Sequence, residues 1–340
     1  MKSKILVFIT LLIFLIPNVV LANTTDSGVV PYSVQANLPE NQINDNVSYF
    51  DIEMEPGESQ DLEVTVYNSS NEELEVNVNN TIASTNSNGI ITYDGLEEGE
   101  EVHESMKNKF TDISSLDEST VKIPAGEQKV VSLEVNAPDE SFDGVILGGL
   151  YFTMEPGESE ESEGVAIQNR YAYALAVQIR EEGNENVVEP DLELIDVEAG
   201  AINYRTGLST TFGNLSPKII NTSFEGSVYR EGEDEPLYQN MIEEFIIAPN
   251  AQFNFNVMYD NHALESGNYV FKANVKSEDD EWNFEEEFEI TEEVADEANE
   301  EAVELIEEAD NSLQIILIII GAAILIILIV ILLLMVRKRK

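Results

Sequence analysis

The apolar run near the C-terminus restricts this chain more than any other feature of its sequence. Residues 313–336 are apolar except for Gln314. At about 1.5 Å per residue, the run is long enough to cross a hydrocarbon core of roughly 30 Å as one helix, the form that pairs its own backbone groups in lipid. Four basic residues follow at once: Arg337, Lys338, Arg339 and Lys340. Because basic residues are retained on the cytoplasmic side, the sequence predicts a transmembrane helix at 313–336 in the lipid bilayer and a cytoplasmic tail at 337–340.

The N-terminal residues 1–22 have the pattern of a signal peptide. Lys2 and Lys4 precede an apolar stretch from Ile5 to Val20, and Ala22 ends a small-residue cleavage pattern. A second membrane span is the alternative, but the small-residue exit favours cleavage. We therefore expect a single-pass type I membrane protein with its ectodomain in the cell wall space or at the cell surface.

The charge balance between these two ends restricts the partners. All 66 acidic residues, but only 11 of the 17 basic ones, lie there, which leaves this region with a charge of about −55. A field of this sign repels nucleic acid and favours cationic partners. The chain has no cysteine, which excludes disulfides, thiolate metal sites and cysteine nucleophiles. The spacing of an EF-hand loop is absent, and whether Ca²⁺ binds elsewhere is left open.

Between the ends, the sequence has the pattern of an all-β protein. Leu62–Tyr67, Leu74–Val78 and Val130–Val135 alternate apolar and polar residues with period two, as half-buried strands do. Turn formers separate these segments at short, regular intervals. Such a pattern is typical of an antiparallel β-sandwich, which we expect at residues 30–157.

An acidic, serine-rich break at residues 155–164 separates this region from a second one. Its first expected strand runs from Val165 to Ile179, and further β segments continue to Ile290, so we expect a second β-sandwich at 158–291. From 292 to 312 the composition changes to Glu, Ala and Asp, with apolar residues at three- to four-residue spacing. This pattern predicts an acidic stalk that is helical or partly disordered and continuous with the span.

An ordered set of segments resembles a known protein family. In the first half these are Tyr32–Val34, Leu38–Gln42, Tyr49–Ile52, Pro56-Gly57, Ala83–Gly89 and Phe142–Leu150. In the second half they are Asn169–Tyr173, Gly226–Tyr229, Ala248–Phe253, Gly267–Tyr269 and Trp282–Phe284. Together they are similar to the two domains of WxL-interacting proteins.

The resemblance implies a non-catalytic surface adaptor of Gram-positive bacteria with two tandem immunoglobulin-like domains. In this family the first domain binds peptidoglycan, and the second binds WxL-domain surface proteins and host extracellular matrix proteins. The family's contact residues are not carried over, because no single motif places them in this sequence. Candidates must therefore come from the chemistry of the residues themselves.

Polar loop residues are the candidates for peptidoglycan contact, because fixed amide groups meet sugar hydroxyls and aromatic rings stack on sugar rings. In the first domain these are Asn41, Gln42, Asn86, Asn88 and Tyr93. The alternative is purely structural, since Asn86, Asn88 and the glycine that follows are ordinary turn formers.

A protein partner of the second domain would bind to an exposed sheet edge or to an apolar patch with aromatic anchors. The candidate anchors are Tyr171, Tyr173, Tyr204 and Phe212. The alternative for each is a place in the hydrophobic core.

Two rival classes remain open from the sequence. Paired carboxylates would suffice for a cell-wall glycan hydrolase, and this chain has many acids. The chain has only two histidines, His103 and His262, and they are far apart in sequence. It therefore has few residues from which to build a zinc site or a Ser-His-Asp triad. We expect no metal site and no cofactor. The second rival is a passive spacer that only raises another molecule above the membrane.

Overall fold

The computed structural model describes residues 30–96, 102–154, 170–184, 188–303 and 305–306. These residues form two β-sandwich domains side by side, and little of the described chain is helical. The expectation of an all-β protein with two sandwiches is confirmed. The expected signal peptide and membrane span lie outside the described residues. Within them, no helix is both long and apolar enough to cross a bilayer.

The first domain is built from two sheets. One has the strand order β1 (Tyr32–Asn37), β3 (Ser59–Asn68), β9 (Gln128–Asn136) and β7 (Ser114–Leu116). The other has the order β2 (Phe50–Glu53), β11 (Ala172–Arg180), β10 (Val145–Met154), β4 (Leu74–Ile82) and β8 (Thr120–Ile123). The short helix α2 (Phe110–Ile113) leads into β7.

The period-two alternation of these strands produces the first core. In β3, Leu62, Val64 and Val66 are buried, and they face the apolar residues of the other sheet, such as Val76 and Val78 of β4. Burial of aliphatic side chains contributes about 25 cal/mol for each Å² removed from water. The sequence pattern therefore explains which face of each strand is buried.

Strand β11 belongs to a sheet of the first sandwich. Its residues were expected to open the second sandwich, but β11 pairs with β10 antiparallel and with β2 parallel in the first. Leu175, Val177 and Ile179 are buried in the first core. The alternation identified a strand but could not identify its partner, because strand pairing depends on contacts that are distant in sequence. Structurally, the first domain ends after Arg180 and the second begins at Leu192.

The second domain also has two sheets. One has the order β12 (Leu192–Ile202), β13 (Arg205–Asn214), β16 (Gln252–Met258), β5 (Ser84–Thr85) and β6 (Ile91–Thr92). The other has the order β15 (Tyr238–Ile247), β14 (Ile220–Arg230), β17 (Gly267–Lys276) and β18 (Glu281–Ile290). The core between them is aromatic: the Phe212 ring contacts the rings of Phe224, Phe253, Phe271 and Phe284.

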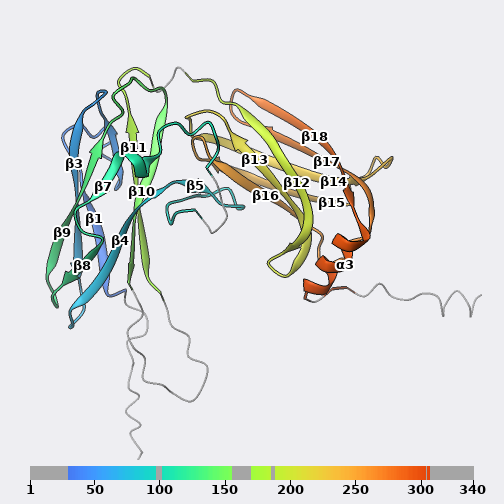
Figure 1. The fold of residues 1–340 in the computed structure, drawn as a ribbon, viewed down its shortest axis with the longest axis horizontal. Coiled ribbons are helices and arrows are strands. Elements are labelled where there is room, and N and C mark those ends of the chain that lie inside the picture. Colours follow the sequence, from blue (N-terminus) through green and yellow to red (C-terminus); the bar gives the residue numbers. More distant parts are fainter. Residues whose placement is uncertain (1–29, 97–101, 155–169, 185–187, 304, 307–340) are drawn as a thin grey trace, which may run out of the picture.

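Strands β5 and β6 come from the first domain but belong to a sheet of the second. The chain leaves β4, crosses to the other sandwich and forms a hairpin there, where Thr85 pairs with Phe253 of β16 (Figure 1). The Thr85 side chain also accepts a hydrogen bond of 2.8 Å from the backbone N–H of Ala248. At the turn, the carbonyl of Gly89 accepts a backbone hydrogen bond of 2.9 Å from Ile246. We call this segment, residues 83–93, the crossing hairpin.

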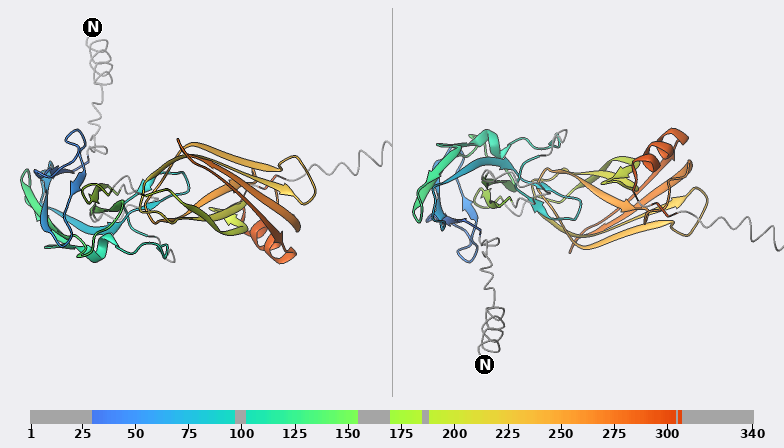
Figure 2. Two further views of the ribbon diagram at one scale, coloured as in Figure 1. Left: turned by 90° about the horizontal axis from the view of Figure 1, so that it is seen from above. Right: turned by 90° about the horizontal axis from the view of Figure 1, so that it is seen from below.

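Two further contacts hold the domains together. The backbone N–H of Val145 donates a 2.7 Å hydrogen bond to the carbonyl of Pro217. The His103 imidazole lies 2.8 Å from the carboxylate of Glu193. A small apolar cluster from both domains lies between them, with Ala83, Leu147, Ala248 and Ala251 at its centre. Two views at right angles to Figure 1 show the domains in one elongated body (Figure 2).

The expected stalk begins with a helix that is packed rather than free. Helix α3 (Glu292–Glu301) follows β18 directly, at the end of the second domain far from the first (Figure 2). The Thr291 hydroxyl caps it by accepting from the N–H of Val294. Ala295 and Ala298 are buried in the second core. The sequence showed the helical spacing, but the small apolar face it creates is used to cover the sandwich.

Gly89 and Gly126 provide a matched test of the crossing hairpin. Both have positive φ, +74° and +69°, so alanine at either position carries a backbone strain of about 1–2 kcal/mol. A Cβ at Gly89 would lie 2.5 Å from the Phe245 ring and 2.7 Å from its Cα, whereas a Cβ at Gly126 meets nothing within 4 Å. We expect Gly89→Ala to lower the free energy of unfolding by about 1–3 kcal/mol more than Gly126→Ala, measured by urea denaturation. Equal losses would contradict close docking of the hairpin.

Candidate binding sites

Asn41 and Gln42 lie side by side in the loop before β2, and both side chains hold that loop in place. The Asn41 amide donates to the carbonyl of Glu53 at 2.7 Å and exchanges hydrogen bonds with the Gln60 amide. The Gln42 side chain donates to two loop carbonyls and accepts from the N–H of Asp51. Gln42 is buried, so Asn41 is the one of the two that borders an open surface.

Asn41 borders a cavity of about 560 Å³ in the first domain. The lining is dominated by acids: Glu53, Glu55, Glu58, Glu181 and Glu182, together with Met54 and Pro56. We call it the acidic cavity. The Glu181 carboxylate accepts hydrogen bonds from Ser141 and Phe142, and the Glu58 carboxylate accepts one from the N–H of Glu55. Glu53, Glu55 and Glu182 are exposed.

The other three candidates of the first domain lie on the crossing hairpin. The Asn86 side chain accepts hydrogen bonds from the N–H groups of Asn88 and Ile90, as a turn former does. Asn88 is exposed at the tip of this turn. Tyr93 packs on Gly149, and burial raises the pKa of Tyr93 to about 12. These residues lie at the junction of the domains and do not meet Asn41.

The four aromatic candidates for a protein partner are also scattered. Tyr171 and Tyr173 lie on the first domain, where the Tyr173 ring packs edge-on against Tyr32 at 5.1 Å. Phe212 is completely buried in the core of the second domain and offers no surface. Tyr204 is 70 % exposed, in the two-residue turn between β12 and β13 with a φ of +63°. Of the four, Tyr204 alone is both in the second domain and exposed.

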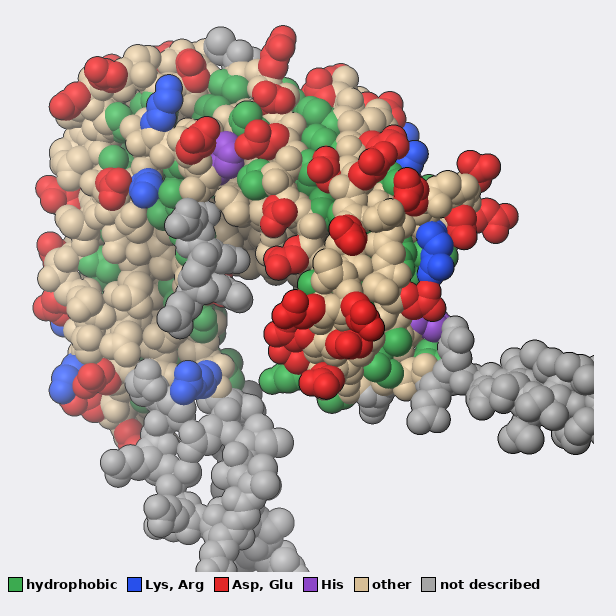
Figure 3. All heavy atoms as spheres, turned by 45° about the vertical axis from the view of Figure 1, so that its right-hand side comes forward, with side chains coloured by type: hydrophobic (Ala, Val, Ile, Leu, Met, Phe, Trp, Pro, Cys, Tyr) green, Lys and Arg blue, Asp and Glu red, His purple; other side chains and the backbone are tan. Residues whose placement is uncertain are grey.

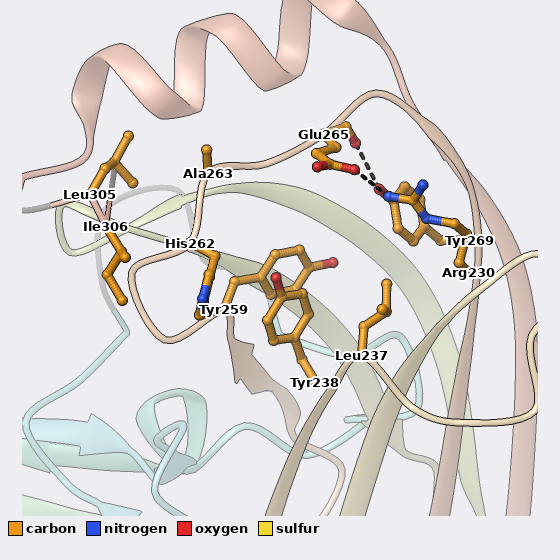
Figure 4. A pocket seen from close by; sticks show the side chains of 10 residues that line it. All are labelled: Arg230, Leu237, Tyr238, Tyr259, His262, Ala263, Glu265, Tyr269, Leu305 and Ile306. Carbon is orange, nitrogen blue, oxygen red and sulfur yellow. Dashed lines mark hydrogen bonds and ion pairs between the residues drawn. The ribbon is translucent and has the colours of Figure 1, made fainter. Parts of the chain in front are cut away.

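The second domain carries a cavity of about 550 Å³ at its end near α3, shown in Figure 4. The rings of Tyr238 and Tyr259 stack at 4.0 Å on one side of it. Leu305 and Ile306, after α3, lie on a second side, and the Arg230–Glu265 ion pair beside Tyr269 lies on a third. The remaining lining residues are Leu237, His262 and Ala263. We call it the tyrosine cavity.

Tyr259 has an unusual place in this cavity. Its side chain is 2 % exposed, and its hydroxyl has no hydrogen-bond partner among the described residues. Burial, with the nearby Tyr269 and Tyr238, raises the pKa of Tyr259 above its ordinary range, so the phenol stays neutral. A buried hydroxyl without a partner costs free energy, which favours a role for it with a bound group.

The tyrosine cavity was not predicted from the sequence. Its three tyrosines come from β15, from the residue after β16 and from β17, and only the sheet topology brings these positions together. The one usable signal was the Gly267–Tyr269 segment of the family resemblance, which contains Tyr269. The acidic cavity was missed in the same way, except for Asn41.

The described residues hold no metal cluster and no paired histidines. No group of three or more His, Asp or Glu side chains in this part of the chain could hold a metal ion. His103 is engaged with Glu193 and Ser105, and His262 contacts the carbonyl of Tyr259. The two imidazoles lie in different places, so they do not form a shared acid–base site.

Two family models match the chain. Residues 32–154 match the WxL Interacting Protein, peptidoglycan binding domain, and residues 162–300 match the WxL Interacting Protein, host binding domain. Both models describe binding domains, which defines the class as that of two-domain binding proteins. The chain belongs to the WxL-interacting protein family. The second model includes β11, although this strand lies in the sheet of the first domain.

Solved structures similar to this chain include several chaperones. The YadV chaperone is 12 % identical with a TM-score of 0.29, covering 77 % of this chain and 100 % of that one. The CupB2 chaperone of Pseudomonas aeruginosa is 11 % identical with a TM-score of 0.28, covering 66 % and 91 %. The E. coli chaperone DraB is 12 % identical with a TM-score of 0.28, covering 76 % and 96 %. No curated protein matches the sequence.

A comparison of two buried tyrosines tests whether the Tyr259 hydroxyl lacks a hydrogen-bond partner. Tyr32 is 1 % exposed, and its hydroxyl donates to the carbonyls of Phe152 and Tyr171, each at 3.0 Å. We expect Tyr32→Phe to lower the free energy of unfolding by about 1–3 kcal/mol, because it leaves buried carbonyls unpaired. Tyr259→Phe should leave it unchanged within about 0.5 kcal/mol or raise it, since no hydrogen bond is lost. Thermal unfolding of the two variants measures the contrast, and a large loss in Tyr259→Phe would reveal a partner.

Proposed function

We propose that this protein is a membrane-anchored, non-catalytic adaptor of the Gram-positive cell surface. Its first domain binds peptidoglycan, and its second binds WxL-domain surface proteins or host matrix proteins. The observation that carries this proposal is the match of both family models, in order, over 32–154 and 162–300. The apolar run at 313–336 with its basic tail supplies the anchor, and residues 1–22 supply the export signal.

The acidic cavity is the part of the first domain best suited to peptidoglycan. It is concave, and carboxylates converge on it from two segments of the chain, β2 with its following turn and the end of β11. Sugar hydroxyls donate hydrogen bonds to carboxylates, and such charge-assisted bonds are stronger than neutral ones. Asn41 forms part of the wall. Asn86, Asn88 and Tyr93 are less suited, because they lie on the crossing hairpin away from this cavity, where Asn86 shapes the turn and Tyr93 packs on Gly149.

The junction between the domains fits the role of an adaptor. A load applied to peptidoglycan at one domain and to a protein at the other would pass through the crossing hairpin and the Val145–Pro217 contact. Because these contacts are backbone hydrogen bonds and packed side chains, the two binding sites keep a fixed separation.

Co-sedimentation of the full chain with insoluble peptidoglycan tests this function. We expect the protein to sediment with the wall material and to release no soluble sugar. The triple variant Glu53→Gln, Glu55→Gln, Glu182→Gln should bind at least about tenfold more weakly, because each change removes a charged acceptor. The bound fraction is measured against the amount of peptidoglycan.

A matched control separates specific contact from general charge. Glu63→Gln, Glu73→Gln, Glu127→Gln makes the same charge change at exposed positions of the first domain outside the acidic cavity, and its affinity should equal that of the unmodified protein. Equal weakening of both variants would refute the cavity assignment. Released sugar fragments would support a hydrolase instead, and no sedimentation of the unmodified chain would support a spacer.

A further inference from the structure

The tyrosine cavity lies at the most acidic loop of the second domain. Arg230 and Leu237 line the cavity, and they border a loop that carries four exposed acids: Glu231, Glu233, Asp234 and Glu235. Glu265 and Asp260 add two more exposed carboxylates. Figure 3 shows that acidic side chains also outnumber basic ones on the visible face of the second domain. A cleft with this rim attracts cations.

One cation of the protein itself, the Arg230 guanidinium, already lies against an aromatic ring and a carboxylate of this cavity. The Arg230 guanidinium lies 5.9 Å from the centre of the Tyr269 ring and forms an ion pair with Glu265. Aromatic faces attract cations through the ring quadrupole, and Tyr238 presents a second, half-buried ring in the same cavity. Arg230 is the one permanently charged cation among the described lining residues, so acids remain for a second cation.

The walls fit a cation that is carried on an aliphatic stem. Leu237, Leu305 and Ile306 provide apolar surface for methylene groups, as buried lysine and arginine stems require. Tyr259 lines the same cavity, and its buried hydroxyl, which has no partner among the described residues, can accept an N–H from an ammonium or guanidinium head that reaches it.

The surroundings indicate that the stem belongs to a protein. Two large apolar residues of the lining are exposed, Ile306 at 51 % and Leu237 at 40 %. Val303 at 57 % precedes the lining segment, and Tyr204 at 70 % lies on the turn to which Val303 is hydrogen-bonded. Backbone hydrogen bonds from Val303 to Tyr204 and from Ile306 to Asn261 hold the segment after α3 against the domain. An aromatic and apolar patch around an acid-rimmed cavity has the anatomy of a protein interface with one central anchor.

We propose that the tyrosine cavity binds a lysine or arginine side chain of a protein partner, with its stem against the leucine and isoleucine wall and its head between Tyr238 and the rim carboxylates. This proposal rests on the protein-binding half of the proposed function and names the site that performs it.

Small blocked amino acids test the chemistry directly on the full chain. The probes are the N-acetyl amides of arginine, lysine, norleucine and phenylalanine, with binding measured by saturation-transfer NMR. We expect the arginine and lysine probes to bind and to weaken at high salt. Norleucine amide has the lysine stem without the charge, so it should not bind at the same concentration, and neither should phenylalanine amide.

Variants locate the binding. Tyr238→Ala should weaken the cationic probes about five- to tenfold, and Tyr238→Phe should restore them, because the ring and not its hydroxyl attracts the charge. Tyr259→Phe should weaken them about threefold through loss of the acceptor. Tyr229→Ala is the matched control, because Tyr229 already faces Lys272 at 5.6 Å outside this cavity, and it should leave binding unchanged.

Three outcomes would overturn the proposal. If norleucine amide or phenylalanine amide bound as tightly as the cationic probes, the cavity would be a general apolar site. Equal binding in Tyr238→Ala would place the cations elsewhere on the acidic surface. No binding by either cationic probe would remove the site, while peptidoglycan co-sedimentation and capture of WxL or matrix proteins, measured separately, would still report on the proposed function.

Discussion

The pairing of the crossing hairpin with β16 is the contact on which the rest of the structure depends. It places Thr85 beside Phe253 and extends a sheet of the second domain with chain from the first. In doing so it covers the edge of β16, which would otherwise present unpaired backbone groups. Since the hairpin belongs to the segment between β4 and α2, the second sandwich is not complete without chain from the first. Deleting the first domain would therefore also remove two strands of the second.

The two cores differ in composition, and the core of the second domain contacts the crossing hairpin. The first is mainly aliphatic, whereas the second is built around Phe212 and rings that contact it edge-on or stacked. Phe245, which contacts Phe224 and Phe253 in the same core, lies against Gly89 of the crossing hairpin. The aromatic core thus reaches the domain junction through one side chain. Any shift of the hairpin has to be accommodated by rings that are already close-packed.

Local pattern predicted much of this fold, and non-local pairing explains what it missed. Alternation in Leu62–Tyr67 and Val130–Val135 identified strands and their buried faces, because side-chain direction follows from sequence spacing alone. The partner of β11, the transfer of β5 and β6 and the docking of α3 depend on contacts far apart in sequence. The candidate residues are scattered for the same reason: Asn86 and Phe212 had suitable chemistry, but the topology places one in a turn and the other in the core.

The tyrosine cavity lies close in sequence to the proposed membrane anchor, which determines where a bound partner would lie. Six residues separate Ile306, which lines the cavity, from the start of the apolar run at Leu313. Fully extended, six residues span about 20 Å, so a partner bound at the cavity would lie close to the outer face of the bilayer. The acidic cavity lies in the other domain, beyond the junction. The protein partner would then bind nearer the membrane than peptidoglycan does. The junction keeps these two levels apart, because the β5–β16 pairing and the shared apolar cluster join the two domains.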